Sequence, residues 1–302
     1  MPAPASSIDY AELGNRLRAY RIGASLPAEE VAERLGISRA ALYRMEQGKI
    51  VKIETLERLA ELLGTSMTSL LGVEVEYYPT ARGFLERLRQ IEQDAERIVA
   101  HFGPISQLLA SDSYLGALET MLLESTPAPS RNDGPTRATG HREEVDGILD
   151  ILRERRRSFA ARRPAIISLI GLRELERFMQ TGLVGRPDLD ESARQPRIQA
   201  ARQEVERIAG LMENEPMNIQ IALVEDAMPA TSFQLLYNPR RTVLAVSPFR
   251  LGEMPSIRNG IATITASPEP VRLYQEMIDQ LWKESLKGKT GAAQLRKLLR
   301  RT

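Results

Sequence analysis

Residues 26–48 read LPAEEVAERLGISRAALYRMEQG, and this stretch determines how the first part of the chain folds. Apolar residues recur at helical spacing on each side of Gly36, as Val31 and Leu35 show in the first half. Glycine suits the turn between the halves because it adopts positive φ without steric cost. Ser38 follows as a side-chain cap for a second helix. The stretch therefore predicts two short helices joined by a tight turn.

The first 72 residues as a whole predict a bundle of five helices. Glycines at positions 48, 64 and 72 each follow an apolar helical segment, which is where glycine ends a helix. We expect a fragment that stops at Gly72 to fold. The helices are expected over residues 9–20, 27–35, 39–47, 53–63 and 66–71.

The second and third of these helices have the spacing of a helix-turn-helix. In that motif the N-terminal side chains of the second helix enter the major groove of DNA. Residues 1–72 contain nine basic and nine acidic residues and are neutral. Residues 34–52, however, contain five basic residues and one acidic residue, a net charge of +4. The basic side chains thus gather where DNA phosphates would lie.

Residues 13–72 resemble the DNA-binding domain of the phage-repressor family, also called Cro/CI or XRE. The resemblance implies a transcription regulator that binds a double-stranded DNA operator. One departure lies at the start of the second helix, where Pro27 and Ala28 replace the usual Ser or Thr cap and Gln. The residues that match the family are Leu17, Arg18, Arg21, Val31, Ala32, Gly36, Ile37, Ser38, Glu46, Gly48, Leu56, Leu59, Ala60, Leu63 and Gly64.

The resemblance also implies roles for residues in and around the motif, which runs from Ala28 to Gln47. Arg21 and Glu46 are expected to form an internal ion pair. Arginine suits a base contact because its guanidinium forms paired hydrogen bonds with O6 and N7 of guanine. The expected base contacts are Arg39, Ala40, Tyr43 and Arg44, and the expected phosphate contacts are Ser38, Lys49 and Lys52.

A helical connector is predicted over residues 73–125. Its strongest feature is an uninterrupted heptad pattern over residues 80–102, which predicts one long helix. That helix either packs within its own chain or pairs with a second copy, and a palindromic DNA site favours a dimer. The residues expected on the dimer face are Phe84, Leu88, Ile91, Ala95, Ile98 and Phe102.

The rest of the chain predicts a flexible linker, an α/β domain and a basic tail. Residues 126–140 contain three prolines and two glycines, as linkers often do. Residues 141–286 alternate helical and strand patterns, with about five short strands. Residues 287–302 are basic and predict a solvated helix, a second DNA-backbone contact or a docking helix. The expected fold class is therefore mainly α up to residue 125 and α/β beyond the linker.

Composition argues against several kinds of chemistry. The chain has no cysteine and two histidines, so no metal site is expected. It lacks a phosphate-binding loop and a G-x-S-x-G motif, and we expect neither enzyme activity nor a cofactor. No apolar run approaches the roughly 20 residues of a membrane-spanning helix. Arginines at element ends either form surface ion pairs or bind a small anionic effector; they are Arg162, Arg163, Arg240, Arg241, Arg250 and Arg258.

Together these patterns predict a cytoplasmic, homodimeric transcription regulator, by default a repressor. Its C-terminal region, which loosely resembles the effector domains of larger family members, is expected to dimerise and to sense a signal. Two alternatives stay open. One is an antitoxin-type DNA-binding protein whose C-terminal region binds a protein partner, and the other is an enzyme with a DNA-binding appendage.

Overall fold

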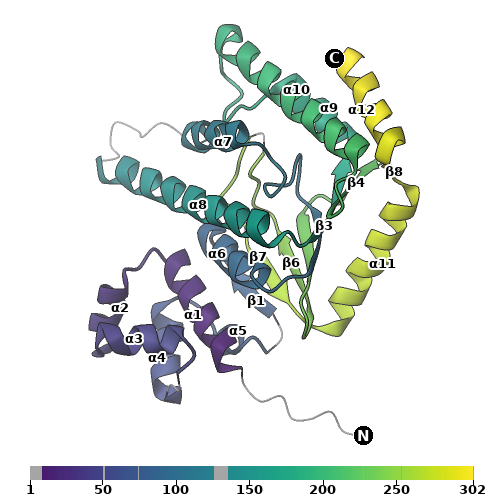
Figure 1. Ribbon diagram of the computed structural model, residues 1–302. Coiled ribbons are helices and arrows are strands. Elements are labelled where there is room, and N and C mark those ends of the chain that lie inside the picture. The colour runs from purple at the N-terminus through teal and green to yellow at the C-terminus, as the bar shows by residue number, and fades with distance from the viewer. Residues whose placement is uncertain are drawn as a thin grey trace, which may run out of the picture.

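The computed structural model describes residues 9–49, 52–73, 75–125, 135–226, 228–252 and 254–301, with the backbone alone for 135–139. Five helices come first, as predicted, and a larger part built on a mixed β-sheet follows (Figure 1). The five helices are α1 (Tyr10–Gly23), α2 (Ala28–Leu35), α3 (Arg39–Glu46), α4 (Ile53–Leu62) and α5 (Met67–Leu71).

The sheet has eight strands in the order β1-β7-β6-β5-β2-β3-β4-β8. Strands β2, β3 and β4 are parallel, and the other neighbouring pairs are antiparallel. About five strands were expected, and the structure adds short strands at both edges and one in the centre. The strands are β1 (Val75–Tyr78), β2 (Arg97–His101), β3 (Ala165–Gly171), β4 (Ile219–Val224), β5 (Ser232–Tyr237), β6 (Thr242–Ser247), β7 (Ala262–Thr265) and β8 (Leu286–Lys287).

Helices cover both faces of the sheet. Side chains alternate between the two faces along each strand, and apolar side chains on both faces pack against these helices. In β2, Ile98 and Ala100 belong to the main core, while Val99 belongs to a second apolar cluster together with Ile278 of α11. The helices of this part are α6 (Ala81–Glu92), α7 (Asp112–Glu124), α8 (Pro135–Arg162), α9 (Leu172–Thr181), α10 (Glu191–Asn214), α11 (Pro268–Glu284) and α12 (Gly288–Arg301).

The prediction of one long helix over residues 80–102 is wrong. Helix α6 ends at Glu92, and β2 follows as a central strand between β3 and β5. A central strand is buried on both faces, so its apolar run satisfied the heptad positions by coincidence. The six residues assigned to a dimer face are all buried in the core of their own chain and offer no surface to a second copy: Phe84, Leu88, Ile91, Ala95, Ile98 and Phe102.

The segments around this helix also differ from expectation. Residues 73–125 are not a separate helical connector, because β1, α6 and β2 complete the sheet and its core. Most of the expected linker, residues 126–134, lies outside the described residues, and residues 135–140 begin α8. The basic tail is mainly α12, which packs against α10 and buries Leu295 completely. None of the helices in the described ranges combines the length and hydropathy that crossing a membrane would require.

Candidate nucleic-acid interface

The turn between α2 and α3 is built from local hydrogen bonds. Gly36 has φ +68°, and the amide of Ile37 donates to the carbonyl of Ala32 at 2.9 Å. A side chain at Gly36 would be strained in this left-handed conformation. The hydroxyl of Ser38 accepts from the amide of Ala41 at 3.1 Å and caps α3. The turn therefore fixes the direction in which α3 leaves α2.

One face of α3 is exposed and the other is buried. Leu42 and Met45 face the core. The side chains assigned to DNA contact are all exposed, and helical spacing places Arg39, Ala40, Tyr43 and Arg44 on the same side of α3. The exposed residues are Ser38, Arg39, Ala40, Tyr43, Arg44, Lys49 and Lys52. Residues 50 and 51, between the two lysines, lie outside the described residues.

The two arginines of this face have different surroundings. Arg39 forms an ion pair with Glu29 of α2 and donates to the hydroxyl of Tyr43 at 3.2 Å. The hydrogen bond with Tyr43, followed by the charge of Glu29, raises the pKa of Arg39. Arg44 forms no ion pair with any described residue. DNA must therefore compete with Glu29 for Arg39, whereas Arg44 is available directly.

An ion pair and a close approach of the two backbones join α3 to α1. Arg21 donates to both carboxylate oxygens of Glu46, at 2.6 and 3.1 Å, in the pair that the resemblance implied. At Gly14, a Cβ atom would lie only 2.5 Å from the carbonyl oxygen of Glu46. The absence of a side chain at Gly14 thus lets α1 approach the end of α3 closely. These contacts orient the exposed face of α3 relative to α1.

Comparison with known families agrees with this geometry. Residues 12–70 match the family model of the helix-turn-helix domain. This segment is a helix-turn-helix domain. The match runs from α1 into α5, and it supports a DNA-binding regulator. No curated protein sequence matches the chain.

The helix-turn-helix domain is attached to the sheet by buried charges that sequence reasoning did not identify. Arg87 of α6 is fully buried and donates to both carboxylate oxygens of Glu76 in β1, at 2.8 and 3.0 Å, and to Glu12 of α1 at 2.5 Å. From α1, Arg16 contacts Glu76 at 3.5 Å and donates to the carbonyl of Leu70 at 2.6 Å. Only tertiary contacts reveal such a cluster, because a lone charged residue in a helix usually faces solvent.

These charges stabilise the ionised carboxylates. Burial by itself would raise the pKa of Glu12, but the guanidinium groups of Arg87, Arg241 and Arg16 lower it from 4.5 to about 2. Burial opposes ionisation of Glu76 as well, and Arg87 and Arg16 likewise lower its pKa. The interface between α1 and the sheet is therefore a buried network of charges that requires both carboxylates to be ionised.

The arginines assigned to an effector do not meet at one place. Arg162 donates to the carbonyls of Glu92 and Ala95, at 2.7 and 3.3 Å, and so has a structural role. Arg163 and Arg250 line two different pockets. The other three lie beside acidic residues: Arg240 near Asp9 at 3.8 Å, Arg241 with Glu12 at 2.6 Å and Arg258 with Glu144 at 3.1 Å.

Proposed function

We propose that this protein is a sequence-specific transcription regulator that binds a palindromic operator as a homodimer. The observation that carries the proposal is the exposed face of α3, where Arg39, Tyr43 and Arg44 lie on a helix whose other face is buried. Repression is the default mode, because a dimer bound over a promoter excludes the polymerase. The protein acts in the cytoplasm and is not an enzyme.

The positions of these side chains support base recognition. Residues at the N-terminal end of a recognition helix contact base edges in the major groove. Arg39 lies at the first position of α3 and Arg44 five residues later, so both lie within the two turns that enter the groove. Lys49 and Lys52 lie beyond the helix and contact phosphates, which position the domain without selecting sequence.

A dimer is required because one helix-turn-helix covers only one half of a palindromic site. The two half-sites lie about 34 Å apart, one turn of DNA. The surface that joins the copies is not the heptad face of residues 80–102, since those side chains are buried within one chain. The surface that joins the two copies lies on the exposed part of the sheet domain. The same domain also senses a small anionic molecule.

The experiment is a selection of bound sites from a random double-stranded DNA library by the full-length protein. We expect a palindromic consensus with half-sites one helical turn apart. Arg272→Ala is the matched control variant, because Arg272 is exposed on α11 and forms an i,i+4 pair with Glu276 at 2.7 Å. It should select the same consensus. Selection of no consensus by the wild-type protein would refute sequence-specific binding.

A further inference from the structure

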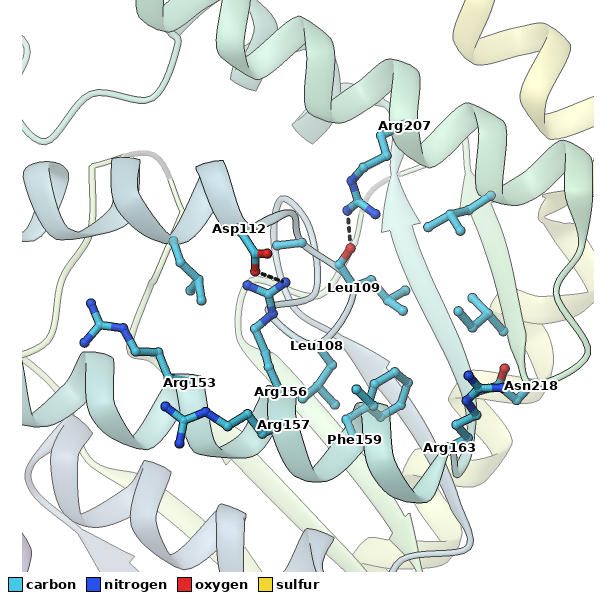
Figure 2. A pocket seen from close by; sticks show the side chains of 15 residues that line it. Leu108, Leu109, Asp112, Arg153, Arg156, Arg157, Phe159, Arg163, Arg207 and Asn218 are labelled. Atoms are coloured by element: carbon cyan, nitrogen blue, oxygen red, sulfur yellow. Dashed lines mark hydrogen bonds and ion pairs between the residues drawn. The ribbon is translucent and has the colours of Figure 1, made fainter.

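A cleft of about 620 Å³ opens between α8, α10 and the segment that leads into α7. Figure 2 shows arginine side chains around it, with Arg153, Arg156 and Arg157 on α8 and Arg207 on α10. The cleft also has an apolar wall, which includes Leu108, Leu109, Leu115, Phe159, Leu211 and Ile219. It therefore combines positive charge with an apolar surface.

The arginines share the cleft because of their spacing on α8. Arg153, Arg156, Arg157 and Ala160 follow one another by three, one and three residues, which places them on one side of a helix. Arg163 follows directly after the helix with φ +49° and also lines the cleft. The run ILRERRRSFAARR at 151–163 was the sequence signal for this site.

The positive charge of the cleft is only partly compensated. Of the fifteen lining residues, only Asp112 carries a carboxylate. It lies 3.0 Å from Arg156, and its side chain is fully exposed. Arg153 pairs with Asp150 at 3.0 Å and Arg207 with Glu204 at 3.2 Å, whereas Arg157 and Arg163 form no ion pair with any described residue. Like charges in one cleft repel each other, so an anion that contacts several of them lowers the free energy of the whole site.

We propose that this cleft binds a phosphorylated small organic molecule with an apolar body. Guanidinium groups match phosphate oxygens by paired hydrogen bonds, and the leucines and Phe159 provide contact for the apolar body. The effector role of this ligand rests on the proposed function, whereas its binding does not. The cleft does not continue the exposed face of α3, because α6 lies between α8 and the α1 helix of the helix-turn-helix domain (Figure 1).

The cleft is connected to the helix-turn-helix domain through buried contacts. On the other side of α8, Arg155 donates to both carboxylate oxygens of Glu92 in α6, at 2.7 and 2.8 Å. Helix α6 packs in turn against α1, where Gly23 and Gly83 bring the two helices close together. A ligand that moves α8 therefore acts on a contiguous set of packed helices that ends at α1.

The test uses isothermal titration of the full-length protein with 1-naphthyl phosphate, inorganic phosphate and 1-naphthol. We expect 1-naphthyl phosphate to bind more tightly than either fragment, because only it contacts both the arginines and the apolar wall. Arg157→Ser and Arg163→Ser should each weaken its binding by about tenfold or more, since each removes a charge-assisted hydrogen bond. Ala160→Asp should weaken it at least as much, because the exposed Ala160 lines the cleft and the new carboxylate repels phosphate.

The control is Arg272→Ser, which removes one exposed arginine from α11, outside the cleft, and should leave binding unchanged. Equal binding of 1-naphthyl phosphate and 1-naphthol would overturn the proposal, as would variants of the cleft that bind like the wild type. If the protein bound no DNA but bound 1-naphthyl phosphate in an arginine-dependent way, the proposed regulator function would be refuted and the proposed ligand site would be supported. A change in operator affinity on adding 1-naphthyl phosphate, lost in Arg157→Ser, would support both.

Discussion

At the scale of single residues, the exposed arginines of α3 and the lysines after it are expected to act differently. Arg44→Ala should cost about 1–3 kcal/mol on the selected operator and much less on random DNA, because it removes a base contact. Lys49→Ala should weaken binding to both DNAs and reduce the salt dependence of log Kd by about one unit. Fluorescence anisotropy at several salt concentrations measures both effects. Equal losses on both DNAs for Arg44→Ala would refute its role in sequence recognition.

Glu12 provides a second prediction at this scale. The pKa of Glu12 in the folded protein is about 2, below the ordinary 4.5. The ionised carboxylate therefore makes its full contribution to the free energy of unfolding above pH 4.5, and this contribution disappears as the pH falls toward 2. The pKa shift corresponds to a stabilisation of the folded protein by about 3 kcal/mol at most, and solvent screening reduces this value. Urea unfolding should show Glu12→Gln less stable than the wild type at pH 7, with the difference shrinking at low pH.

The matched control for Glu12 is Glu57→Gln. Glu57 is exposed on α4 and forms no ion pair with any described residue. We expect it to leave stability unchanged at pH 7. A stability difference for Glu12→Gln that stayed constant down to pH 2.5 would contradict the assignment of the buried charge network.

At the scale of elements, the packing of α1 against α3 depends on Gly14. Gly14→Ala should destabilise the fold by about 1–3 kcal/mol, because the new methyl group meets the backbone of Glu46 and overpacks the contact. Gly116→Ala on α7 is the matched control. A Cβ atom at Gly116 has no neighbour within 4 Å, so alanine should stabilise α7 by up to about 1 kcal/mol. Thermal unfolding of both variants measures the contrast, and a stable Gly14→Ala protein would refute the close contact.

At the scale of the whole molecule, the helix-turn-helix domain and the sheet share one buried interface. A fragment that ends at Gly72 lacks Glu76, Arg87 and Tyr78, the last of which stacks on Tyr20 with ring centroids 4.8 Å apart. We therefore expect this fragment to unfold at a lower urea concentration than the full-length protein. Circular dichroism at 222 nm follows both transitions. An equally stable fragment would show that the interface contributes little.

Oligomeric state is the other prediction at this scale. Light scattering should give a dimer for the full-length protein and a monomer for the fragment, because the exposed surface of the sheet domain is expected to join the two copies. The fragment should also bind the operator far more weakly, since it contacts one half-site alone. A monomeric full-length protein that binds a palindromic operator tightly would contradict the proposed dimer.

The sequence alone was enough for the helix-turn-helix domain and for most elements after residue 140. Both depend on local signals: Gly36 at a turn, Ser38 at a helix start, and the apolar run over 165–170, which forms most of β3. Those signals act between residues a few positions apart, so a linear pattern contains them. The exposed face of α3 follows from the same local spacing.

The tertiary structure alone decided the role of residues 95–102, the buried charges of α1 and the arginine cleft. Residues 97–101 form a strand because β3 and β5, far away in the chain, supply its hydrogen-bonding partners, and no local pattern shows that. Likewise, the half-buried Glu12 is paired with Arg87, 75 positions along the chain. The cleft arises where α8 and α10 converge. Burial and pairing depend on distances in space, which a sequence specifies only through the complete fold.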